Sequence, residues 1–138
     1  MADSGELPTT IRIKSWAMLI LAEKKPTPEN MTMMQAFEWY VPDDHKHWKR
    51  LHDQAAQLKA TGVDNIWIPP GCKASSPSGN GYDIYDLYDL GEFDQKGSKG
   101  TKWGTKDELL ALVSKANEVG LGIYWDAGNS LAPIGTTQ

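Results

Sequence analysis

The chain has very little cysteine: Cys72 is the only one among 138 residues, so no disulfide can form within it. A single thiol is typical of proteins kept in a reducing compartment, which predicts a cytoplasmic location. A long hydrophobic run is also missing. The best candidate, residues 16–22, is much shorter than the roughly 20 apolar residues that span a bilayer, and charged residues 23–25 follow it where a signal peptide would have small ones. We therefore expect no membrane partner.

An excess of positive charge is absent as well. Lys and Arg total 14 against 18 for Asp and Glu, giving a net charge of −4, which argues against a nucleic-acid partner. Hydrophobic residues make up 40% and charged residues 23%, as in ordinary globular proteins. The length fits one domain. It is about half of the ~250 residues that a complete eight-unit (β/α) barrel needs.

The order of apolar segments predicts alternating strands and helices after a leader, residues 1–30, that we expect to be poorly ordered. Thr105 and Glu108 have the spacing of a helix capping box, T-x-x-E, and a glycine at position 62 or 120 can end a helix. The first expected elements are a strand over 31–40, a helix capped by Asp43 or Asp44 and ended by Gly62, and a strand over 63–68. One long loop over 71–104 follows. The last two elements are a helix from Thr105 to Gly120 and a strand over 121–125.

This β-α-β-loop-α-β pattern predicts an α/β fold with parallel strands and right-handed crossovers. The strands are apolar throughout, which is typical of strands covered by helices in doubly wound sheets and in barrels. Periodicity alone does not choose between the two. A structureless loop as long as 71–104 is rare in a compact domain unless it serves a site.

Ligand sites of parallel α/β folds lie at the carboxyl ends of the strands. Three places qualify here: residues 38–40, the loop after Ile68, and Asp126. Aromatic faces beside carboxylates suit a carbohydrate, whose C–H groups stack on rings while its hydroxyls bond to polar groups. The alternative is that Trp39 and Tyr40 only close the hydrophobic core.

Two polar clusters are candidates for a metal site. The carboxylates between residues 82 and 94 lack EF-hand spacing, which favours a solvated polar face. The spacing of the three histidines does not suit a zinc site, so surface histidines are expected. The members of the two clusters are Asp83, Asp86, Asp89, Glu92 and Asp94, and His45, His47 and His52.

Several runs together resemble the start of the α-amylases of glycoside hydrolase family 13. The resemblance is strongest to bacterial liquefying and intracellular fungal amylases and extends from Met33 to Ala127. It implies that the chain is the N-terminal part, about three strands and two helices, of a (β/α)8 TIM barrel. The runs are MMQAFEWYVPDD, HWKRL, GVDNIWIPP, GYDIYDLYDLGEFDQKG and TKWGTKDEL.

The resemblance also implies an activity, the hydrolysis of internal α-1,4 bonds of starch or glycogen with retention of configuration. That chemistry uses a carboxylate nucleophile and a carboxylic acid. Tyr82 matches the tyrosine that stacks on the sugar next to the scissile bond, and Gln35 and Trp39 match residues near the same pocket. Asp126 opens the family's first signature motif and supports the active site. Calcium is expected for the full-length family.

The chain departs from the family directly after Asp126. The motif D-A-V-L-N-H is replaced by residues 126–131, D-A-G-N-S-L. Ser130 and Leu131 thus stand where the family has a calcium-binding asparagine and a sugar-binding histidine. The catalytic carboxylates belong to later strands. We therefore expect no catalytic residue, metal site or cofactor in this chain.

The sequence thus predicts an N-terminal amylase fragment that is inactive alone and binds an α-glucan weakly. The alternatives are a non-catalytic glucan-binding or regulatory fragment and the product of a faulty gene model. Residues 128–138 form an aberrant tail. A translated intron would explain it, because a GGT codon for Gly128 followed by Asn129 would contain a splice-donor sequence.

Overall fold

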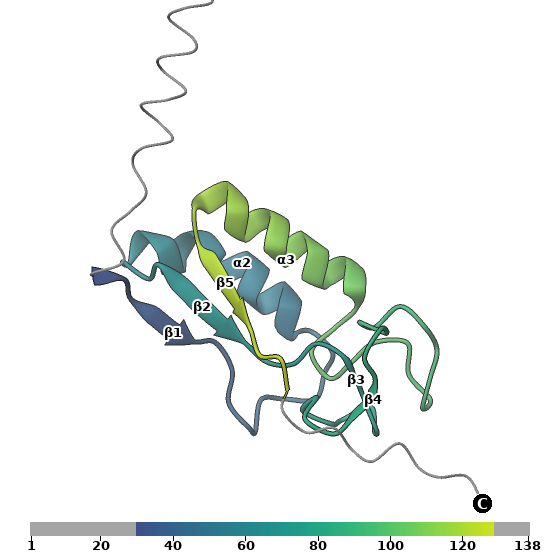
Figure 1. Cartoon of the computed structure of the whole chain (residues 1–138). Helices are drawn as coiled ribbons and strands as arrows, with labels where there is room; N and C mark the ends of the chain where they lie inside the picture. Colours follow the sequence, from purple (N-terminus) through teal and green to yellow (C-terminus); the bar gives the residue numbers. More distant parts are fainter. Residues whose placement is uncertain (1–29, 129–138) are drawn as a thin grey trace, which may run out of the picture. The chain divides into compact units, whose positions relative to one another are not determined.

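The computed structural model describes residues 30–128 (Figure 1). All but the last residue of the expected leader and all but the first residue of the aberrant tail lie outside this range. Two helices alternate with strands, as the sequence predicted. The elements in chain order are β1 (Met33–Gln35), α2 (His47–Ala60), β2 (Asn65–Ile68), β3 (Lys73–Ala74), β4 (Ile84–Asp86), α3 (Lys106–Val119) and β5 (Gly122–Trp125).

The main sheet is parallel, with strand order β1-β2-β5. Ile66 at its centre pairs with Met34 on one side and Ile123 on the other. Because the strands follow chain order and each crossover contains one helix, right-handed connections place both helices on the same face. Figure 1 shows α2 and α3 side by side there. This is the arrangement of consecutive units of a (β/α) barrel, whereas a doubly wound sheet would carry helices on both faces.

The hydrophobic core lies between the sheet and the two helices. Ile66 and Ile68 are fully buried, while Trp67 between them is 36% exposed, because alternate side chains of a strand point to opposite faces. The buried residues of the core are Ala36, Trp48, Leu51, Ala55, Ile66, Ile68, Trp103, Leu109, Leu112, Ala116 and Leu121.

The capping signals of α3 are confirmed. The Thr105 hydroxyl accepts a hydrogen bond from the Glu108 N–H, and the Glu108 carboxylate accepts one from the Thr105 N–H, while Gly120 ends the helix with a φ of +73°. The expected cap of α2 is wrong: that helix begins at His47, and Asp44 instead accepts a hydrogen bond from the Lys46 N–H before it. Neither helix of the described part is long and apolar enough to cross a membrane.

Two further expectations need correction. The strand predicted over 31–40 covers only Met33–Gln35, because the chain turns after it: the Glu38 carboxylate accepts a hydrogen bond from the Tyr40 N–H. The loop over 71–104 is not free of strands either, since β3 and β4 pair as a short antiparallel sheet within it. That hairpin places residues 75–83 close to the carboxyl ends of the main strands.

Candidate functional site

Two aromatic side chains from different strand ends stack on one another. Trp39 follows β1 and Tyr82 precedes β4, yet their ring centroids are 6.0 Å apart and their planes differ by 11°. Trp39 is 61% exposed and Tyr40 is 85% exposed. The alternative that these two residues close the core is therefore wrong, and their rings are open to a ligand.

Tyr82 is fixed from its other end by the residue that follows β5. Its hydroxyl donates a hydrogen bond to the Asp126 carboxylate at 2.9 Å, and Asp126 is itself held by a bond from its N–H to the Ile68 carbonyl. Burial and then the Asp126 carboxylate raise the pKa of Tyr82 to about 12, so the phenol keeps its proton. Three strand ends thus converge on one ring.

A cavity of about 390 Å³ opens beside this aromatic pair. The polar side chains among its lining residues carry two hydroxyls, an amide and a carboxylate. The lining residues are Trp39, Ser78, Gly79, Asn80, Tyr82 and Asp83. Gly79 and Gly81 let the loop pass close to its surroundings: a Cβ at Gly81, where φ is +92°, would lie 2.5 Å from the Pro70 carbonyl oxygen. The mixture of ring faces and a few polar groups is suited to a sugar.

Of the predicted site residues, the structure brings Trp39, Tyr82 and Asp126 together. Gln35 is not among the residues that line the cavity; it lies at the end of β1, and its side-chain amide donates to the Phe37 carbonyl at 3.0 Å. Asn80 was not among the predicted residues. Its amide lines the cavity and donates to the Trp39 carbonyl at 3.3 Å. In the sequence, only the glycine on each side distinguishes Asn80 from other polar residues of the loop.

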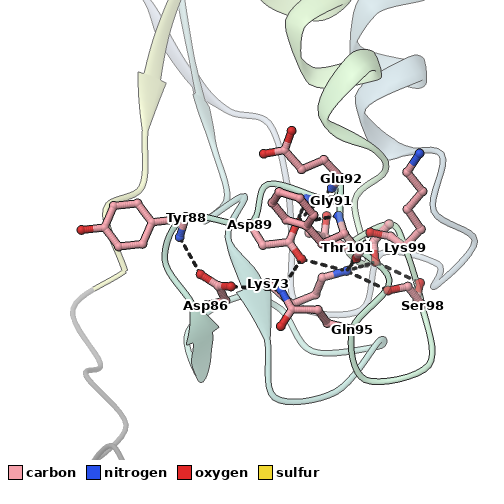
Figure 2. A network of polar contacts seen from close by, with 12 residues as sticks. Lys73, Asp86, Tyr88, Asp89, Gly91, Glu92, Gln95, Ser98, Lys99 and Thr101 are labelled. Atoms are coloured by element: carbon pink, nitrogen blue, oxygen red, sulfur yellow. Dashed lines mark hydrogen bonds and ion pairs between the residues drawn. The ribbon is translucent and has the colours of Figure 1, made fainter.

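A buried ion pair organises the rest of the loop, as Figure 2 shows. Lys73 is 1% exposed and Asp89 is fully buried, and their charged atoms are 3.5 Å apart. The Lys73 ammonium also donates to carbonyl oxygens at 2.7 to 3.3 Å; these belong to Phe93, Ser98, Lys99 and Gly100. One side chain therefore connects the two ends of the segment 93–100.

Asp89 completes this arrangement. Its carboxylate accepts hydrogen bonds from the N–H groups of Gly91 and Glu92 at 2.8 and 2.9 Å. Burial alone would raise the pKa of Asp89, but these N–H donors outweigh it and hold the pKa below the ordinary value. The expectation of a solvated polar face over residues 82–94 is wrong for Asp89.

The histidine prediction is wrong in one place. His47 is buried, its Nε2 is 2.8 Å from the Ala36 carbonyl oxygen, and burial lowers its pKa. His45 and His52 are partly exposed. Within residues 30–128, no three His, Cys, Asp or Glu side chains are grouped as a metal site would need.

The sequence is similar to those of bacterial amylases. It is 47% identical over 108 residues to a glucan 1,4-alpha-maltohexaosidase of Bacillus sp. (strain 707), covering 78% of this chain and 21% of that protein. It is 48% identical over 97 residues to an alpha-amylase of Bacillus licheniformis, covering 70% and 19%. A cytoplasmic alpha-amylase of Escherichia coli (strain K12) is 44% identical over 95 residues, covering 67% and 19%.

No protein-family model matches the chain. Solved structures share the fold: an alternansucrase in complex with isomaltotriose has a TM-score of 0.58 at 20% identity, covering 71% of this chain and 10% of that one. A glycosyltrehalose synthase has a TM-score of 0.51 at 22% identity, covering 70% and 11%. The chain is thus similar to α-amylases over 67–78% of its length, and it spans about a fifth of the length of these relatives. These relatives are bacterial, and the likeness to fungal amylases stays a prediction.

Proposed function

We propose that this chain is part of an α-amylase-type hydrolase that acts on α-1,4-glucans, and that it supplies the aromatic wall of the glucan site. One observation carries the proposal. The stacked pair of Trp39 and Tyr82 borders an open cavity at the carboxyl ends of the strands, in a segment 47% identical to a maltohexaosidase.

The cavity offers the contacts that a glucose unit needs. The apolar face of the sugar ring would stack on Tyr82, because the bond from its hydroxyl to Asp126 fixes the ring. Asn80 and Asp83 would bond to sugar hydroxyls. Since one stacked ring and a few hydrogen bonds form a small interface, we expect weak binding, with a dissociation constant on the order of 1 mM.

The same cavity lacks the groups for hydrolysis. Retaining glycosidases need two carboxylates about 5–5.5 Å apart across the scissile bond. Asp83 is the one carboxylate among the lining residues, and Asp126 already binds the Tyr82 hydroxyl and the Gly128 N–H. We therefore expect the 138-residue chain to release no reducing sugar from starch. Release above that of a heat-inactivated sample would contradict this.

Titration calorimetry with maltohexaose tests the binding. The wild-type chain should bind maltohexaose and not cellohexaose, and Tyr82→Ala should abolish the signal. Tyr88→Ala is the matched control, because Tyr88 lies in the same loop, is 86% exposed and does not line the cavity. Equal affinity of Tyr82→Ala and the wild type would remove Tyr82 from the site.

A second candidate, a non-catalytic glucan-binding or regulatory fragment, is favoured by the single carboxylate in the cavity. It predicts maltohexaose binding without hydrolysis even when the chain is completed with the later strands of a bacterial relative. The product of a faulty gene model would not bind at all.

We also propose that the chain itself requires no metal and is located in the cytoplasm. The absence of a group of three potential metal ligands within residues 30–128 supports the first point, so calcium and EDTA should leave the melting temperature unchanged. The single cysteine supports the second. Microscopy of a tagged chain in its source cells tests it, and secretion would contradict it.

A further inference from the structure

Lys102 is a buried lysine whose contacts lead to the aromatic cavity. It is 7% exposed and lies just before α3. Its ammonium donates to the Asn80 side-chain carbonyl at 2.6 Å and to the Trp39 backbone carbonyl at 3.3 Å. Because the Asn80 amide also donates to the Trp39 carbonyl, these three residues form a closed set of hydrogen bonds.

This lysine has an unusual environment for a buried charge. No carboxylate of the described residues forms an ion pair with it, in contrast to Lys73 with Asp89. Its ammonium lies 5.1 Å from the centre of the Trp103 ring, which adds a weak cation–π attraction. Burying a charge without a counter-ion is costly, so a neutral side chain would serve packing better.

The ammonium is suited to a different task, because its several N–H donors can hold more than one acceptor at once. Trp39 and Asn80 come from segments far from Lys102 in the sequence, and both line the cavity. The bond from Lys102 to the Asn80 oxygen also determines which end of that amide is the donor.

We propose that Lys102 is a positioning residue of the glucan site: it aligns Trp39 with Tyr82 and orients the Asn80 amide without touching the ligand. This rests on the proposed function, that the cavity binds an α-glucan. Lys102 itself does not line the cavity. Its effect on a ligand must therefore pass through its two partners.

The test compares Lys102→Met, Lys102→Arg and the control Lys115→Met, which changes a lysine of α3 that pairs with Glu118 away from the cavity. In titration calorimetry, Lys102→Met should weaken maltohexaose binding about tenfold, Lys102→Arg should recover part of the affinity, and Lys115→Met should match the wild type. A role in packing alone would lower the melting temperature and leave the affinity of the folded protein unchanged.

A second readout needs no ligand. Burial against its surroundings is the largest cause of the raised Tyr82 pKa, so a displaced Trp39 should lower that pKa from about 12 toward 10. Ultraviolet titration against matching Tyr82→Phe chains measures it. Wild-type affinity and an unchanged Tyr82 pKa in Lys102→Met would overturn the inference.

The outcomes separate the two proposals. If the wild type does not bind maltohexaose, the proposed function fails and the Tyr82 pKa alone decides the role of Lys102. If Lys102→Met does not fold, Lys102→Gln replaces it, since glutamine keeps a polar side chain but is uncharged and one bond shorter than lysine. A Tyr82 pKa that remains about 12 in Lys102→Gln would then overturn the inference.

Discussion

At the scale of single residues, the bond between Tyr82 and Asp126 connects the loop after β2 to the end of β5. The phenol donates and the carboxylate accepts, so the bond is lost when Tyr82 is deprotonated. This one contact lets two segments that are distant in sequence share a site.

The raised Tyr82 pKa makes this bond measurable. Replacing Asp126 by Asn should lower the pKa from about 12 toward the ordinary value of 10, because the negative charge is lost. Since the folded pKa lies above the unfolded one, burial of the phenol together with its bond to Asp126 favours the protonated form. The resulting contribution to stability is complete below pH 10 and is lost between pH 10 and about 12. Ultraviolet titration against a Tyr82→Phe chain checks it; a wild-type pKa equal to that of exposed tyrosines would contradict it.

Lys73 allows a prediction about stability. Lys73→Met should lower the free energy of unfolding by about 3–5 kcal/mol, because Asp89 would remain as a buried charge without its partner. Lys99→Met, an exposed lysine of the same loop, should change it by less than about 0.5 kcal/mol. Urea unfolding followed by tryptophan fluorescence gives both values. Equal midpoints for the two variants would show that the pair does not organise the loop.

At the scale of elements, α3 is specified by its own sequence. Thr105→Ala removes one half of the capping box and should destabilise the protein by about 1 kcal/mol. Ser114→Ala, at an exposed position of the same helix, should be neutral or slightly stabilising, because alanine has the higher helix propensity. The midpoint of urea unfolding is the measurement. A loss in Ser114→Ala as large as in Thr105→Ala would contradict the capping role.

The sequence predicts those features that depend on neighbouring residues. The two ends of α3 and the strand before Pro69 are of this kind. Once parallel strands are assumed, the pattern also brings residues 38–40, the loop after Ile68 and Asp126 together, whereas Tyr82 within that loop is indicated only by the resemblance to amylases. The pattern could not show that Asp89 is buried, because its partner Lys73 lies on β3, in a different part of the loop. The hydrogen bonds of Asn80 could not be predicted for the same reason: its partners come from distant segments.

At the scale of the whole described part, both helices cover one face of the sheet and leave the other uncovered (Figure 1). Large apolar side chains lie on that second face: Met33, Trp67 and Tyr124 are 49%, 36% and 52% exposed. Within residues 30–128, the outer edges of β1 and β5 also have no strand partner. Such faces and edges promote association with other chains.

We therefore expect the 138-residue chain to associate as its concentration rises. Tyr124→Lys should reduce this association, because a charge on the uncovered face is costly to bury between two chains, and lysine disfavours pairing along the β5 edge. The matched control is Leu110→Lys: Leu110 is similarly exposed, at 55%, but lies on α3. Sedimentation velocity over a range of concentrations measures the effect. If both variants reduce association equally, the effect is a general one of added charge. A wild-type chain that remains a monomer and melts cooperatively would show that the uncovered face of the sheet does not cause association.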